Sequence, residues 1–215
     1  MAITNYSELQ AAVANWLNRT DLSGSANRIP EFIDLAEARL NRDLKLRAME
    51  SDQAVATAIG SRLIALPAGY LEPLALFIER ATGREPLIFV PSRMETDAVA
   101  AEPEFWTIDG GNIAFERPAD KVYSMTFKML TAFALSDANP ANWLLTNYPD
   151  LYLAATLAEG FAFLMDDEAL KWVARYGQAL AEVNAKEAIA RSMAQLKTDL
   201  PLPRQWRTFD INRGW

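Results

Sequence analysis

The amino-acid sequence predicts an α+β fold, in which a helical bundle carries an inserted antiparallel β-rich domain and an extended C-terminal arm. Three observations predict it. Residues 151–165 (LYLAATLAEGFAFLM) carry one charge, Glu159, and are otherwise apolar or small on every side, as in a helix enclosed by protein. Residues 51–131 show strand and turn patterns, and residues 199–215 abandon the helical pattern. The expected domains are the bundle (1–50 and 132–198), the β-rich insertion (51–131) and the arm (199–215).

Two amphipathic helices are expected at the N-terminus. The first spans residues 5–18, with Asn5 and Glu8 placed as a capping box. The second opens at Pro30 and ends near Arg47, which lies four residues after Asp43 and suits an ion pair with it. The charged residues expected on the outer face of this helix are Glu31, Asp34, Glu37, Arg39 and Arg42.

The middle of the chain predicts an antiparallel sheet built from hairpins. Three pairs of short strand-like runs each flank a glycine-containing turn, and a further strand is expected at 121–130. The pairs are 53–59 with 62–66, 74–79 with 85–90, and 106–109 with 112–116. Residues 91–101 interrupt the sheet and predict a short helix capped by Ser92 and Glu95.

The C-terminal half predicts two more helices. The apolar stretch 151–165 is shorter than the roughly 20 residues that cross a bilayer, so we expect it inside the protein, with no membrane contact. After Asp166, a long helix is expected over 167–197. Its apolar side is Val173, Tyr176, Leu180, Val183, Ile189, Met193 and Leu196.

Composition narrows the classes of function. The chain has no cysteine and no histidine, which removes disulfides, thiolate sites and the commonest general base and metal ligand. No cofactor and no metal are therefore expected. The net charge of −7 argues against a protein that grips nucleic acid by its phosphates. The N-terminus lacks the features of a secretory signal.

The last residues have an unusual composition for an unbound terminus. Aromatic and arginine residues are the types that anchor interfaces. In this segment they are Arg204, Trp206, Arg207, Phe209, Arg213 and Trp215. Two interpretations stay open, an arm that lies on a partner and a strap across its own subunit.

Three stretches, together with the order of the elements, carry a resemblance to a known family. They are 16–22 (WLNRTDL), 30–44 (PEFIDLAEARLNRDL) and 135–167. In these the chain resembles the head-to-tail adaptor proteins of tailed bacteriophages, also called tail accessory or head-completion proteins. The resemblance implies a non-enzymatic virion protein at the head-tail junction, assembled in the host cytoplasm.

It further implies a homo-oligomeric ring, usually of twelve copies, that docks beneath the portal protein. Such a ring extends the DNA channel, through which the genome passes without sequence-specific binding. It also offers a docking platform for distal tail proteins, a nozzle or tail hub, and for tail fibres. On this basis the six arm residues are expected to contact the portal, and the loops around Gly83 and Gly110 a distal partner. Glu159 either pairs with an arginine of a neighbouring subunit or points out at an edge of the bundle.

Two alternatives remain. A carboxylate-based cell-wall hydrolase would use Glu102 with Glu104, or the cluster 166–168. Structural roles explain both more simply, because the first pair lies in a loop and the second caps a helix N-terminus. The other alternative is a soluble helical binding module of prophage origin.

Overall fold

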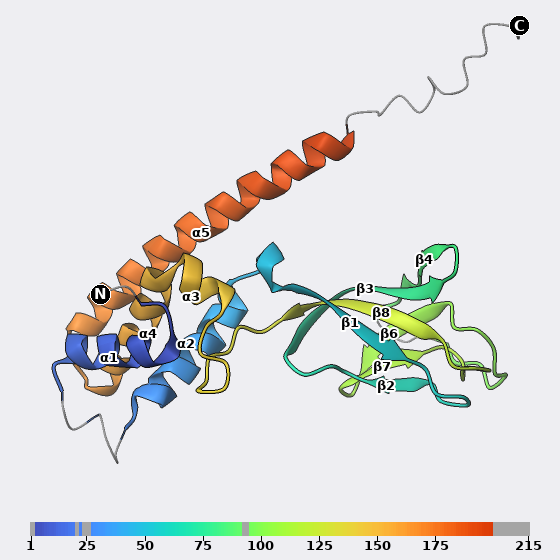
Figure 1. The fold of residues 1–215 in the computed structure, drawn as a ribbon, viewed down its shortest axis with the longest axis horizontal. Coiled ribbons are helices and arrows are strands. Elements are labelled where there is room, and N and C mark those ends of the chain that lie inside the picture. The colour runs from blue at the N-terminus through green and yellow to red at the C-terminus, as the bar shows by residue number, and fades with distance from the viewer. Residues whose placement is uncertain (1–2, 20–21, 23–26, 92–94, 200–215) are drawn as a thin grey trace, which may run out of the picture.

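The computed structural model describes residues 3–19, 22, 27–91 and 95–199, with side chains up to Ser192. The predicted α+β fold is confirmed. Five α-helices form one half of the molecule and eight strands the other (Figure 1). None of the described helices is long and apolar enough to cross a membrane.

The helical half is built around α4 (Pro149–Phe163). It packs against α1 (Tyr6–Leu17), α2 (Ile29–Asp43), α3 (Trp143–Asn147) and α5 (Glu168–Asp199). Most of α4 is buried, from Leu151 to Phe161, which confirms the predicted enclosed helix. Its Gly160 lets α1 approach closely, because a Cβ there would come within 3.1 Å of Leu17.

The β-rich half consists of two four-stranded sheets. The first has the order β1-β8-β3-β4, made of Glu50–Ala56, Ser124–Thr131, Tyr70–Arg80 and Gly83–Pro86. The second has the order β2-β7-β6-β5, made of Leu63–Ala65, Asn112–Phe115, Phe105–Asp109 and Ile88–Phe89. Every pairing is antiparallel except β5 with β6. Both sheets contribute to a separate core that includes Phe127, Trp106 and Phe115.

Two linkers join the halves. The first linker (residues 44–49) leads from α2 through the 3₁₀-helix η2 (Arg47–Met49) into β1. The second linker (residues 132–135) follows β8. Glu50 of β1 pairs with Leu130 of β8, so the chain enters and leaves the β-rich half at the same end. Because each half has its own core, we propose that they are the domains expected from the sequence.

Two of the three predicted hairpins are confirmed and one is wrong. The turns at 80–83 and at 110–111 join β3 to β4 and β6 to β7. The chain does turn at Gly60, but β1 pairs with β8 and β2 with β7, so this turn joins the two sheets. The Gly60 N–H donates to Ala119 O (2.8 Å), a partner that no local pattern specifies.

The prediction of a short helix at 91–101 is also wrong for the residues that the structure describes. Residues 95–101 are not helical, while Ser92 of the predicted cap lies outside the described residues. The Asp97 N–H instead donates to Glu116 O (2.8 Å). A long-range backbone bond therefore takes the donor that the helix would have used.

The N-terminal helices agree with prediction apart from three details of α2. Asn5 caps α1 by accepting from the Glu8 N–H (2.9 Å). Helix α2 ends at Asp43 because Leu44 is extended, so the predicted pair of Asp43 with Arg47 does not form. Asp43 accepts instead from the Tyr176 hydroxyl (2.7 Å). Glu37, predicted on the outer face, is buried, with 7% of its surface exposed.

Helix α5 has the predicted length, and part of its predicted apolar side is buried. Of the predicted residues, Tyr176 and Val183 are buried against the helical core and Leu180 is partly buried, whereas Val173 and Ile189 are exposed. Trp172, which was not predicted, is also buried. The side chains of Met193 and Leu196 lie outside the described ones. The apolar side fits poorly because α5 packs along its first half and then projects from the bundle (Figure 1).

Candidate partner-binding surfaces

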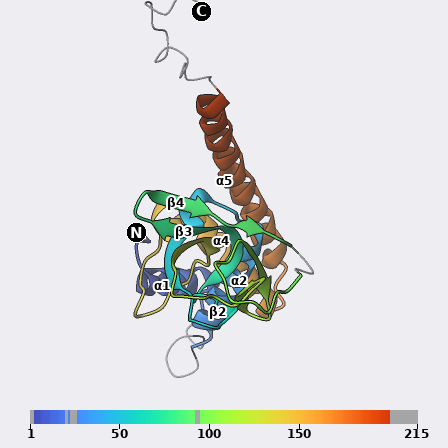
Figure 2. The ribbon, with the colours of Figure 1, turned by 90° about the vertical axis from the view of Figure 1, so that its right-hand side faces the viewer.

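Helix α5 carries the chain away from the rest of the molecule (Figures 1 and 2). Among its described side chains, Glu187 and Arg191 make contacts with the first linker. The predicted arm follows its C-terminal end in the sequence. The six arm residues, Arg204, Trp206, Arg207, Phe209, Arg213 and Trp215, lie outside the described residues.

An aromatic surface lies where α1, α4 and α5 meet. Trp16 is 53% exposed although it packs edge-on against Trp172, with ring centroids 5.2 Å apart. Trp172 stacks in turn on Phe161 (6.4 Å), and the Arg175 guanidinium lies 4.8 Å from the Trp172 ring centre. Three hollows, of about 600, 500 and 350 Å³, share Trp16 in their walls. This Trp16 surface combines tryptophan with arginine, the residue types that dominate binding energy at protein interfaces.

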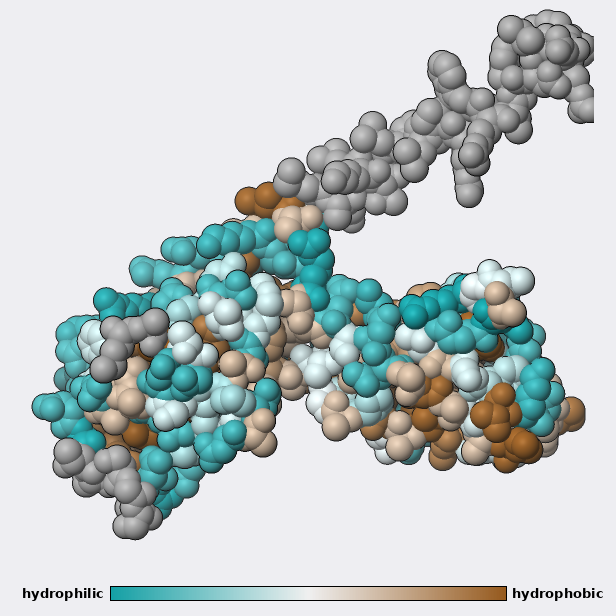
Figure 3. All heavy atoms as spheres, in the orientation of Figure 1, coloured by the Kyte–Doolittle hydropathy of each residue, from teal (hydrophilic) through white to brown (hydrophobic). Residues whose placement is uncertain are grey.

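The β-rich half exposes large apolar side chains of its own. They come from the two edge strands of the second sheet, from β3 and from loops, and Figure 3 shows hydrophobic residues on the surface of this half, most of them toward the end farther from the helices. The residues are Ile59, Leu63, Leu74, Ile88, Phe89, Val99 and Val122. Exposed apolar groups of this kind are typical of contact surfaces.

The two loops predicted to meet a distal partner lie at opposite ends of the β-rich half. The turn before Gly83 follows the end of β3, whereas the start of β3 pairs with Thr131 beside the second linker. Gly111 O accepts from Leu66 N–H (3.2 Å), a few residues before β3 begins, which places the turn of Gly110 near the helices. A single small partner would therefore meet one of these loops rather than both.

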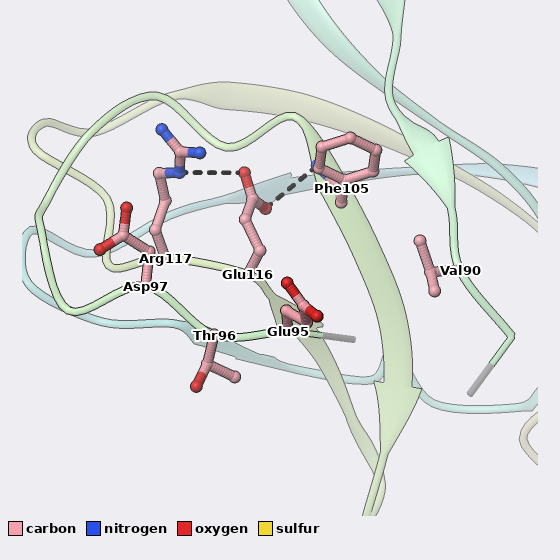
Figure 4. Close-up of a pocket in the computed structure, with 7 residues that line it drawn as sticks. All are labelled: Val90, Glu95, Thr96, Asp97, Phe105, Glu116 and Arg117. Atoms are coloured by element: carbon pink, nitrogen blue, oxygen red, sulfur yellow. Dashed lines mark hydrogen bonds and ion pairs between the residues drawn. The ribbon is translucent and has the colours of Figure 1, made fainter. Parts of the chain in front are cut away.

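A hollow of about 470 Å³ opens beside a buried carboxylate in the β-rich half (Figure 4). Glu116 is 4% exposed and accepts from the Glu104 N–H (2.8 Å) and the Phe105 N–H (3.0 Å). The Arg117 Nε lies 3.2 Å from Glu116 Oε1 in an ion pair but makes no hydrogen bond. Both oxygens of Glu116 thus brace the start of β6.

The described residues include no group of carboxylates placed to hold a metal ion. Glu95 and Asp97 also line the hollow beside Glu116, but they belong to an irregular segment. The contacts of Glu116 therefore indicate a structural role for this carboxylate rather than a catalytic one.

A family model described as SU10 adaptor protein matches residues 4–199 of the chain. This chain belongs to the SU10 adaptor protein family. No curated protein matches it. Membership makes it a bacteriophage adaptor protein, a structural component of the virion that interacts with other phage proteins. The aromatic and apolar surfaces of the adaptor suit such interactions.

Glu159 of the adaptor has its ionic partner within the same chain. Its Oε1 lies 2.6 Å from Arg39 Nη2, which joins α4 to α2, and both side chains are partly exposed. An arginine of a neighbouring subunit is thus not needed to balance this charge. A place for Glu159 at a subunit interface stays a proposal.

In each group of carboxylates that a hydrolase would need, at least one has a structural partner in the adaptor. Glu102 forms an ion pair with Arg80. Asp166 Oδ1 accepts from the Glu168 N–H (2.9 Å) at the start of α5, which is the capping role expected from the sequence. Asp167 and Glu104 are exposed.

Sequence reasoning missed the buried Glu37, whose Oε1 accepts from the Tyr152 hydroxyl (2.6 Å) and the Leu135 N–H (2.7 Å). Burial raises the pKa of Glu37 to about 7, although both hydrogen bonds act to lower it. Burial beside this carboxylate also raises the pKa of Tyr152. A signal was present, because Glu37 follows Ile33 and Ala36 on the apolar side of α2.

Proposed function

We propose that the protein is a head-to-tail adaptor that forms a ring beneath the portal at the head-tail junction of the virion. The observation that carries this proposal is the shape of the adaptor. The helical bundle bears two diverging extensions, α5 and the β-rich half (Figures 1 and 2). A protein that joins two different partners needs two separate contact regions of this kind.

The end of α5 is proposed to face the portal. The chain continues from it into the six arm residues, whose arginine and aromatic side chains suit a protein interface. The β-rich half is proposed to face the distal tail proteins, a nozzle or tail hub and the tail fibres. Its exposed apolar side chains and the loop of Gly83 would supply the contacts.

The ring is proposed to hold twelve copies, by resemblance, and to extend the DNA channel. A net charge of −7 supports the passage of DNA, because an acidic wall repels the phosphate backbone. The Trp16 surface and the neighbourhood of Glu159 are the proposed contacts between copies. Assembly would take place in the host cytoplasm, where the portal is made.

The test compares the full chain with a variant lacking residues 199–215, each mixed with the portal protein of the same phage. Light scattering on a sizing column measures the mass of the complexes. The full chain should join a ring-sized complex, while the truncated chain should remain unbound. Circular dichroism should show that the truncated chain is still folded and helical.

A double variant sharpens the test of the arm. Trp206→Ala with Arg207→Ala should weaken binding to the portal at least tenfold, whereas Thr208→Ala, in the same segment, should bind normally. Undiminished binding of the truncated chain would show that the arm is not the portal contact. A full chain that ignores the portal would contradict the head-to-tail function itself.

A further inference from the structure

Helix α5 is fastened to the first linker by one carboxylate. Glu187 Oε1 accepts from the backbone N–H of Arg47 (3.2 Å) and from its Nε (3.1 Å). The same oxygen accepts from Arg191 Nε (3.2 Å), one turn further along α5. Arg191 also donates to the carbonyl oxygen of Lys45 (2.6 Å). The helix thus holds the linker backbone at two points.

The surroundings keep this carboxylate charged. The Glu187 side chain is 16% exposed, while both guanidinium groups remain about half exposed. Burial acts to raise the pKa of Glu187, but the hydrogen bonds from Arg191 and Arg47 outweigh it and lower the pKa. One anion between two cations is a stable arrangement at neutral pH, and charge-assisted hydrogen bonds are the stronger class.

The first linker continues this connection into the β-rich half. Lys45 pairs with Glu72 of β3 (2.6 Å), and Met49 and Leu46 are buried in the helical core. The second linker is held differently. Asn41 of α2 exchanges two hydrogen bonds with the backbone of Phe133 (2.8 and 2.9 Å). One linker is therefore attached to α5 and the other to α2.

We propose that Glu187, Arg47 and Arg191 form a latch that couples the direction of α5 to the orientation of the β-rich half. A partner that tilts the projecting end of α5 pulls on the backbone at Lys45 and Arg47, and the β-rich half turns with it. If the proposed function holds, docking at one end of the adaptor changes how the other end is presented. The latch itself is a property of the free chain and does not depend on that function.

The absence of cysteine allows a direct measurement on the full chain. Spin labels at Ile189→Cys, an exposed position on the projecting half of α5, and at Thr82→Cys in the turn between β3 and β4 report the distance between the two extensions by pulsed electron paramagnetic resonance. The background chain, which carries only the two labelled cysteines, should give a narrow distribution of distances. Glu187→Ala should widen it at least twofold. Glu31→Ala, which removes an exposed pair with Arg28 at the N-terminal end of α2, is the matched control and should leave the width unchanged.

A salt titration needs no change at the latch. Raising the salt concentration from 0.1 to 1 M shortens the screening length from about 10 to about 3 Å, which weakens in part the ion pairs that Glu187 makes with two half-exposed arginine side chains. The background chain should then widen toward the Glu187→Ala distribution, while Glu187→Ala itself should respond little. A width that changes neither with salt nor with Glu187→Ala overturns the latch. Both measurements use the chain without a portal, so their outcome does not depend on whether the proposed head-to-tail function is right.

Discussion

The two halves of the adaptor each bury a glutamate that supports the backbone, but only one of them has a cation beside it. In the helical half, Glu37 accepts from the Leu135 N–H and the Tyr152 hydroxyl. In the β-rich half, Glu116 accepts from two successive backbone N–H groups, with Arg117 3.2 Å away. The difference teaches that a glutamate can be buried with neutral hydrogen-bond donors alone. At Glu37, burial raises the pKa although these hydrogen bonds act to lower it.

The largest effect is expected from Glu116→Ala in the β-rich half. This change leaves two partly buried backbone N–H groups without their acceptor and the Arg117 guanidinium without its neighbouring charge, which should cost about 3 to 5 kcal/mol of unfolding free energy. Urea denaturation followed by tryptophan fluorescence measures it. Glu104→Ala, an exposed neighbour, should cost less than about 0.5 kcal/mol. A loss near that of the control would mean that Glu116 does not brace β6.

The response to pH tests the burial of Glu37. The pKa of Glu37 is about 7 in the folded state against 4.5 for the ordinary side chain, so the folded state holds its proton more tightly. The stabilisation from this group is complete below about pH 4.5 and is lost as the pH rises through about 7. The stability of the parent relative to Glu37→Gln should fall by up to about 3 kcal/mol across that range. A constant difference would contradict the raised pKa.

Removing the neutral donor tests how Glu37 is held. Tyr152→Phe deletes the hydroxyl that donates to Glu37 and accepts from Asn142 (3.0 Å). We expect a loss of about 2 kcal/mol, because both partners stay buried without it. The same urea experiment on Tyr148→Phe, a half-buried tyrosine in the same half, should show a change near zero. Equal losses in the two variants would assign no special role to the Tyr152 hydroxyl.

The smallest effect is expected at Glu159, the cation-paired carboxylate of the helical half. Its pair with Arg39 is partly exposed, so Glu159→Gln should cost about 1 kcal/mol or less. A loss as large as that of Glu116→Ala would show that exposure does not govern these pairs. Sedimentation of the same variant, alone and with the portal, also tests whether Glu159 lies between subunits. Weakened assembly with normal stability would support that proposal.

The sequence predicted α1, α2, α4 and α5 well because their signals are local, whereas the helix predicted at 91–101 from a local cap pair was wrong. The cap at Asn5 and the enclosed stretch 151–165 are patterns of neighbouring residues, and the structure confirms them. The hairpin predicted at Gly60 failed because strand pairing depends on residues far along the chain. A turn residue shows that the chain reverses direction, but it does not show which strand lies alongside.

The sites followed the same rule. Glu187 and Arg47 are 140 positions apart, so no spacing in the sequence could indicate the latch. Glu37 could have been found as an acidic residue on an apolar helix face, although its partner Tyr152 could not. The six arm residues lie outside the described chain, and their contacts with the portal stay a proposal.

The pairing of Glu50 with Leu130 makes the β-rich half an exchangeable cassette. Its two ends leave the helical half side by side, about 5 Å apart, as neighbouring antiparallel strands are. Any module whose own termini emerge as adjacent strands can be grafted at this place without changing the length of either linker. The helical stem could therefore stay constant while recombination between phage genomes replaces the half that we propose to meet the tail.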